Sequence, residues 1–96
     1  MTDPILEMHA LAKGLVQGVG FRYTVNKFAQ QLNLTGTVCN LSDGSVKIVA
    51  QGSEEALNTL VAKLKQESYP AKVNAISVDF VPLKHLHEEF NIVKDF

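Results

Sequence analysis

A glycine-punctuated segment followed by an arginine is the part of the sequence best suited to chemistry. Three glycines interrupt the stretch Gly14–Gly20, and Arg22 follows two residues later. Glycines allow positive φ angles, at which successive N–H groups turn inward and form a concave nest for an anion. A helix starting here would add partial positive charge, and the guanidinium would add a fork that matches two phosphate oxygens. The pattern favours a phosphate site, although a β-α turn with a solvated arginine has the same composition.

Asn40 is the second residue of interest, because it stands just before the turn signal Ser42-Asp43-Gly44. Its amide group both donates and accepts, so it can hold a water molecule and a phosphoryl oxygen together. An asparagine before a hairpin is also a common structural feature. Taken alone, Asn40 therefore leaves both interpretations open.

Other phosphate and metal motifs do not fit. A P-loop requires a lysine after its last glycine, and a dinucleotide fingerprint requires a third glycine where Tyr23 stands. His85 and His87 are two apart, but they follow Pro82 in a stretch predicted to be a polar loop, and no cysteine accompanies them. We expect a solvated loop there and no metal site.

The elements that would position Arg22 and Asn40 follow from the hydrophobic periodicity. Apolar residues alternate in five stretches, and they recur at helical spacing from Phe21 to about Asn33 and again after Ser53, a favourable N-cap. The predicted strands are Ile5–Lys13, Thr35–Leu41, Ser45–Gln51, Val73–Val81 and Phe90–Phe96. The order is therefore β-α-β-β-α-β with one additional strand.

This order predicts a ferredoxin-like α/β (α+β) sandwich. Right-handed crossovers give a mostly antiparallel sheet of order 4-1-3-2, with both helices on one face and the last strand extending an edge. The ends of the first and second strands then lie about 10 Å apart, two strand spacings, with the third strand between them. We expect the glycine segment and Arg22 to face Asn40 across this gap, which suits a phosphoryl group and a water molecule.

Composition limits the classes of protein. The chain has 96 residues, 46% hydrophobic and 20% charged, with a formal net charge of −1 and one cysteine, Cys39. It is expected to form one domain over residues 1–96. The charge argues against a nucleic-acid partner, and no apolar run approaches the length of a membrane span. The acidic start and lone cysteine favour the cytoplasm and exclude an intramolecular disulfide.

Two blocks of the sequence closely resemble the acylphosphatase family. The segment Gly14-Leu15-Val16-Gln17-Gly18-Val19-Gly20-Phe21-Arg22 is similar to its signature G-x-V-Q-G-V-x-[FM]-R. The segment from Gly36 to Val46 is similar to its second block, G-[FYW]-[AVC]-[KRQ]-N-x-x-D-G-x-V. It departs from that block at Thr37, usually aromatic, and at Cys39, usually basic or polar. We expect these departures to affect packing and substrate approach, with an inert thiol at Cys39.

The resemblance implies a small, monomeric, cytoplasmic hydrolase that cleaves acyl phosphates to a carboxylate and inorganic phosphate. By family correspondence, Arg22 binds the phosphoryl group and Asn40 orients the attacking water. The phosphate cradle corresponds to the backbone amides of Val16, Gln17, Gly18, Val19, Gly20 and Phe21. No metal, cofactor, nucleic acid or membrane is implied.

Other functions share this element order. RNA-recognition modules need stacking aromatics on the first and third strands, and Ile5–Lys13 and Ser45–Gln51 contain none. Metal carriers need paired cysteines after the first strand. Acylphosphatase-like domains also begin large carbamoyl-transferring maturation proteins, although the chain length favours a free-standing enzyme. The principal alternative is a non-catalytic ferredoxin-like module that binds a small molecule or phosphate.

Overall fold

The computed structural model describes residues 4–94 and shows a five-stranded sheet in the order β4-β1-β3-β2-β5. The strands are β1 (Leu6–Leu15), β2 (Thr35–Asn40), β3 (Val46–Gly52), β4 (Lys72–Val81) and β5 (Phe90–Ile92). β1 pairs antiparallel with β3 and β4, β2 pairs antiparallel with β3, and β5 joins β2 in parallel. The predicted order 4-1-3-2, with the last strand at an edge, is confirmed.

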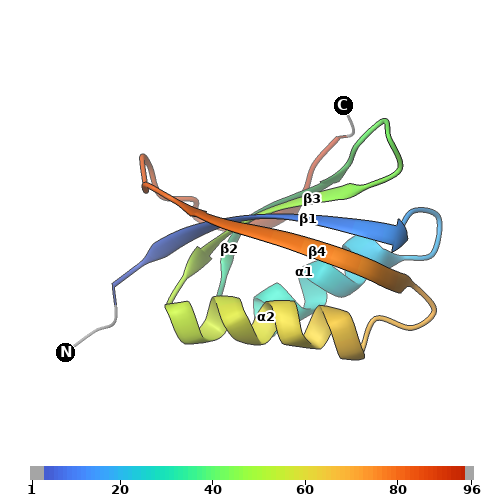
Figure 1. Ribbon diagram of the computed structural model, residues 1–96. Helices are drawn as coiled ribbons and strands as arrows, with labels where there is room; N and C mark the ends of the chain where they lie inside the picture. Colours follow the sequence, from blue (N-terminus) through green and yellow to red (C-terminus); the bar gives the residue numbers. More distant parts are fainter. Residues whose placement is uncertain (1–3, 95–96) are drawn as a thin grey trace.

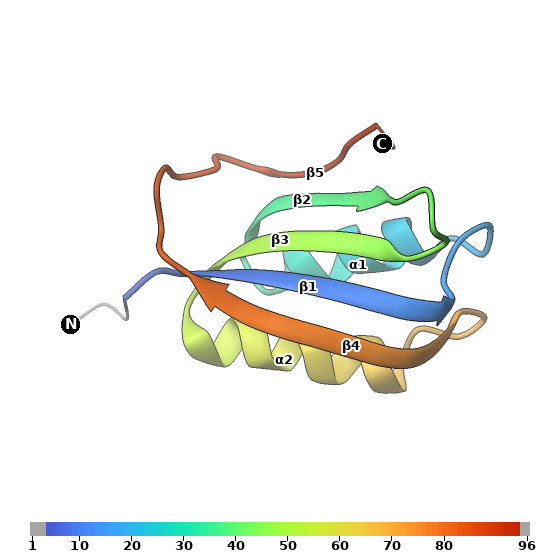
Figure 2. The ribbon, with the colours of Figure 1, turned by 45° about the horizontal axis from the view of Figure 1, so that its top comes forward.

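Two helices, α1 (Phe21–Gln31) and α2 (Glu54–Gln66), pack against the same face of the sheet (Figure 1, Figure 2). α2 begins as predicted, because the Ser53 side chain accepts a hydrogen bond from the backbone N–H of Ala56 at 3.2 Å. The helical periodicity is confirmed by burial. The buried helix residues are Phe21, Val25, Phe28 and Ala29 of α1 and Leu57, Leu60 and Leu64 of α2.

The first strand is longer than predicted. Gly14 and Leu15, expected to belong to the loop, continue β1 and pair with Val73 and Lys72 of β4. The pairing register between β1 and β4 shifts between Lys13 and Gly14, as at a β-bulge. The strand continues past this irregularity, which the alternation of apolar residues does not reveal. The loop before α1 therefore consists of residues 16–20.

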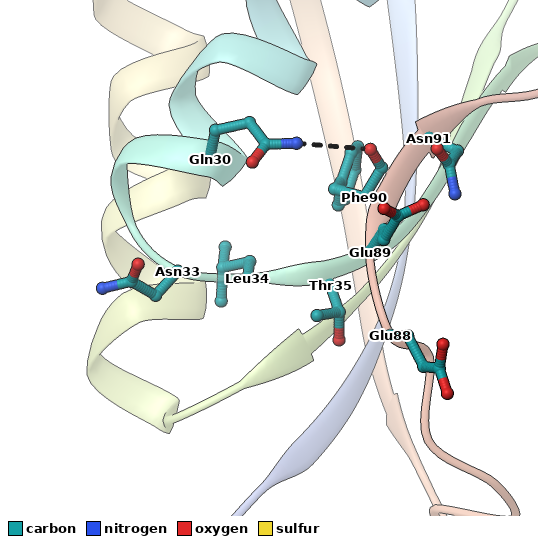
Figure 3. Close-up of a pocket in the computed structure, with 8 residues that line it drawn as sticks. All are labelled: Gln30, Asn33, Leu34, Thr35, Glu88, Glu89, Phe90 and Asn91. Carbon is teal, nitrogen blue, oxygen red and sulfur yellow. Dashed lines mark hydrogen bonds between the residues drawn. The ribbon is translucent and has the colours of Figure 1, made fainter.

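The last strand is shorter than predicted. β5 ends at Ile92, since its pairing with β2 covers only three positions, and residues 95 and 96 of the predicted strand lie outside the described residues. Phe90 is buried, and its carbonyl accepts a hydrogen bond from Gln30 Nε2 at 3.4 Å (Figure 3). β5 is thus held by both β2 and the last turns of α1.

The register across the central strands places the ends of β1 and β2 together. Val46 of β3 pairs with Ala12 of β1 on one side and with Asn40 of β2 on the other. These three residues form one row across the sheet, with β1 and β2 separated by about 10 Å, two strand spacings. The predicted juxtaposition of the two strand ends is therefore present.

A buried glutamine anchors the connection between β4 and β5 at the opposite end of the sheet. Gln51 is 2% exposed, and its Nε2 donates to Glu7 Oε1 at 2.7 Å and to the His85 carbonyl at 2.8 Å. Its Oε1 accepts from the backbone N–H of His87 at 2.8 Å. The histidine stretch, predicted to be a solvated loop, is attached to the sheet through its backbone.

Gln51→Ala should destabilise the protein by about 1–3 kcal/mol, because it leaves buried hydrogen-bonding groups without their partner. Urea unfolding measures the loss, and hydrogen exchange at the His87 amide should speed up more than exchange in β1. Gln66→Ala removes an exposed glutamine and should stay within about 0.5 kcal/mol of wild type. Equal stability of the two variants would contradict the role given to Gln51.

Glu7 should make stability depend on pH. The hydrogen bond from Gln51, followed by the hydrogen bond and charge of His9, lowers the pKa of Glu7 in the folded protein, while its partial burial opposes the shift. A lowered folded pKa gives stability that is complete above the ordinary glutamate pKa of about 4.3 and is lost as pH falls through the folded pKa. Between pH 6 and pH 3, wild type should therefore lose more unfolding free energy than Glu7→Gln. Urea unfolding at each pH measures this loss. If the unfolding free energies of wild type and Glu7→Gln fell equally with pH, the role given to Glu7 would be refuted.

Candidate active site

A small cavity lies where the loop 16–20, the start of α1 and the end of β2 meet. Its volume is about 90 Å³, and it is lined by Val16, Gly18, Gly20, Phe21, Arg22, Tyr23 and Asn40. Six of the eight residues predicted from the sequence are among them, and Gln17 and Val19 are not. A larger cavity of about 380 Å³ lies at the other end of β2 and contains none of the predicted residues (Figure 3).

The loop has the backbone geometry that an anion nest requires. Gly18 and Gly20 both have a φ angle of 76°, a left-handed conformation that residues with a side chain rarely adopt. Gly20 is the N-cap of α1 and has no side chain to cap the helix, and the first turn that follows contains no acidic residue. The positive end of the helix macrodipole therefore faces the cavity without a neighbouring carboxylate to offset it.

The starts of α1 and α2 differ in whether the chain itself supplies negative charge. α2 is capped by the Ser53 side chain and carries Glu54 and Glu55 in its first turn. These acidic groups complement the positive end of α2 from within the chain. α1 has no such groups, so its start is the better of the two for an external anion.

Arg22 and Asn40 reach the cavity from different elements. Arg22 is half-buried in the first turn of α1, and Asn40 is the half-buried last residue of β2. The Oδ1 atom of Asn40 is buried and accepts no hydrogen bond from the described residues, while the residue as a whole does have partners. Both side chains line the same 90 Å³ space, as the predicted topology requires.

Gln17 has a role that sequence reasoning missed. Its Nε2 donates to the backbone carbonyls of Leu41 and Ser45, each at 2.8 Å. These carbonyls flank the turn between β2 and β3, so Gln17 ties the loop directly to the hairpin that carries Asn40. The glutamine of the family signature points to a role for Gln17. The sequence does not show which backbone groups its side chain contacts.

The hairpin beyond Asn40 is itself well ordered by polar contacts. Asp43 accepts hydrogen bonds from the side chain and the backbone N–H of Ser45. The Ser45 hydroxyl is the main cause that lowers the pKa of Asp43, followed by the Ser45 backbone, with a smaller contribution from Lys13. The turn that receives Gln17 is thus stabilised by its own aspartate.

The two departures from the family pattern lie along β2 beside Asn40. Thr37 pairs with Val49 and Cys39 with Lys47 of β3, and both alternate with the buried Val38. Cys39 is only 4% exposed and is a free thiol. Burial restricts access to the thiol, in keeping with the expectation that it is inert.

The arrangement resembles a site for phosphoryl transfer in its chemistry. Such transfer demands positioning of the nucleophile and stabilisation of the charge on the phosphoryl oxygens. A glycine nest, a helix start and one guanidinium supply positive potential, and an amide supplies a polar group on the facing strand. None of the seven lining residues carries a carboxylate or an imidazole.

Known proteins match this chain over nearly all its length. The acylphosphatase family model matches residues 8–92. An acylphosphatase from Lactobacillus johnsonii is 46% identical over 81 residues, which cover 83% of this chain and 89% of that protein. The crystal structure of acylphosphatase from Bacillus subtilis superposes with a TM-score of 0.87 at 42% identity, covering 92% of this chain and 98% of that chain. Full-length HypF, in a phosphate- and nucleotide-bound form, has a 31% identical region with a TM-score of 0.90 that spans 99% of this chain and 13% of HypF.

Fold and cavity together define a ferredoxin-like domain with a small cavity at the start of its first helix. The chain belongs to the acylphosphatase family. It is accordingly a hydrolase of acyl phosphates, and enzymes of this family work without a metal. Within residues 4–94, no helix has the length and apolar character needed to cross a membrane.

Gln17→Met should separate the hydrogen bonds of Gln17 from its volume. Losing both donations from Nε2 should cost about 1–2 kcal/mol of stability and misalign the loop against Asn40, with about a tenfold loss in kcat/KM. Urea unfolding and steady-state hydrolysis of benzoyl phosphate measure the two effects. Gln31→Met, at the exposed end of α1, is the matched control. If the two variants had the same stability and the same kcat/KM, the role given to the Gln17 hydrogen bonds would be disproved.

Proposed function

We propose that the 90 Å³ cavity is the active site, with Arg22 binding the phosphoryl group and Asn40 orienting the attacking water. The single observation that carries this proposal is that both residues line one cavity together with the loop 16–20. The backbone amides of Val16, Gln17, Gly18, Val19, Gly20 and Phe21 are proposed to form the phosphate cradle. Gly18 and Gly20 supply the positive φ angles that turn such amides inward.

The chemical step is an in-line attack of water on phosphorus. The P–O bond to the acyl oxygen breaks, its electron pair leaves with the carboxylate, and inorganic phosphate is formed. A carboxylate is a weak base and needs little help from a general acid. Because no lining residue is a carboxylate or imidazole, we assign the water proton to a phosphoryl oxygen of the substrate itself.

Arg22 and Asn40 should each be needed for this step. Arg22→Ala and Asn40→Ala should lower the rate of benzoyl phosphate hydrolysis by about 10²-fold or more, since each removes a preorganised charge or amide. The assay contains a chelator, and circular dichroism checks that both variants fold. Asn58→Ala on the exposed face of α2 is the control for Asn40→Ala. Wild-type-like turnover by either folded active-site variant would remove that residue from the mechanism.

Arg22 also permits a chemical test in the unmutated protein. It is the only arginine in the sequence. An arginine-specific dicarbonyl reagent should therefore inactivate the enzyme by modifying one site, and inorganic phosphate should slow the modification. Inactivation that phosphate does not slow would argue against phosphoryl binding by Arg22. A folded wild type without turnover would favour the non-catalytic phosphate-binding alternative.

The wider assignments are also proposals. A single acylphosphatase-like domain over residues 1–96 is supported by the Lactobacillus johnsonii and Bacillus subtilis proteins, of which this chain covers 89% and 98%. A monomer is proposed because Arg22 and Asn40, the residues assigned to the chemistry, belong to the same chain, so the mechanism requires no second copy. A cytoplasmic location is supported by the single buried thiol, Cys39, which suits a reducing compartment. The substrate partner is a small acyl phosphate, with no role proposed for nucleic acid or membrane.

A further inference from the structure

We infer that the ring of Tyr23 is the contact surface for the acyl group of the substrate. This inference rests on the proposed function, because it needs the phosphoryl group to occupy the cavity beside Arg22. Tyr23 lines that cavity and is 72% exposed. It therefore borders both the cavity and the solvent, a position from which its ring can contact the part of a substrate that extends beyond the phosphoryl group.

The residues that line the cavity favour contact between the acyl group and this side chain. Two of the residues that line this space of about 90 Å³, Val16 and Phe21, are each only 1% exposed and offer little surface to a substrate. The remaining lining consists of two glycines, the polar side chains of Arg22 and Asn40, and Tyr23. Among these residues, Tyr23 is the one that presents a large apolar surface outward.

No other exposed apolar side chain in the described residues shares this position. The large hydrophobic residues with high exposure are Ile5, Leu15, Tyr23, Tyr69, Phe80, Leu83 and Leu86, and only Tyr23 also lines the cavity. Tyr69 lies in the connection between α2 and β4, at the same end of the molecule as the loop before α1 (Figure 2), but it borders a different cavity. Of the two aromatic residues that line the cavity, Phe21 is buried, so Tyr23 is the one with a ring exposed to an acyl group.

The ring would favour aryl and larger alkyl acyl groups over small or polar ones. An exposed aromatic surface gains free energy when a second apolar group covers it, and aromatic pairs gain more from stacked or edge-to-face geometry. The gain is expected to lower KM for benzoyl phosphate by about two- to tenfold relative to acetyl phosphate. A difference of this size in KM creates a preference among substrates but excludes none, so the enzyme still accepts a broad range of acyl groups.

The test compares KM for benzoyl and acetyl phosphate in wild type, Tyr23→Phe and Tyr23→Ala. Tyr23→Phe keeps the ring and should keep the KM ratio of the two substrates. Tyr23→Ala should abolish the advantage of benzoyl phosphate, moving the ratio by about two- to tenfold. Phe80→Ala, which removes an exposed aromatic ring at the other end of the sheet, should leave the ratio and the rate at wild-type values.

Inhibition by inorganic phosphate distinguishes an acyl contact from an effect on the cradle. Phosphate has no acyl group, so its inhibition constant should change far less in Tyr23→Ala than KM for benzoyl phosphate. Equal rises in both constants, or an unchanged KM ratio, would overturn the inference. If folded wild type hydrolyses neither substrate, the proposed function itself fails, which is a result distinct from either of these.

Discussion

The pairing of one residue, Val46, with Ala12 on one side and Asn40 on the other is the constraint on which the active site depends. It brings two segments that are distant in the chain to the same end of the sheet. The loop leaving β1 and the last residue of β2 then face each other across a single intervening strand. A shift of one residue in this pairing would turn Asn40 to the other face of the sheet, away from the helix that carries Arg22.

Backbone pairing does not connect the loop before α1 to the hairpin between β2 and β3, and Gln17 supplies that connection. Its side chain donates two hydrogen bonds to carbonyls of the hairpin between β2 and β3, and these bonds link the loop to the hairpin without strand pairing. The hairpin is in turn ordered by Asp43 and Ser45. Positive potential is concentrated at α1, whereas the acidic first turn of α2 complements its own helix dipole. The site therefore joins the loop, the hairpin and the start of α1, and of the two helix starts that of α1 is the more favourable for an anion.

Much of this arrangement could be predicted from residue patterns because the governing rules are local or topological. Alternation and helical spacing predicted the elements, and handedness and hairpin connectivity predicted the order of the sheet. The row that joins Ala12, Val46 and Asn40 follows from that order. What could not be predicted depends on contacts between distant side chains and backbone. The partners of Gln17 and Gln51 are of this kind, as is the register shift after Lys13 that extends β1.

Gln51 and its partners lie at the end of the sheet away from the cavity, about 17 Å along β1 from the row of Asn40, at 3.4 Å per residue from Glu7 to Ala12. Selection for heat or cold tolerance and selection for turnover can therefore act on separate sets of residues. Enzymes whose strained sites also limit their stability face a trade-off between the two properties. Here the connection between β4 and β5 offers a region in which thermal adaptation can proceed while the chemistry stays constant.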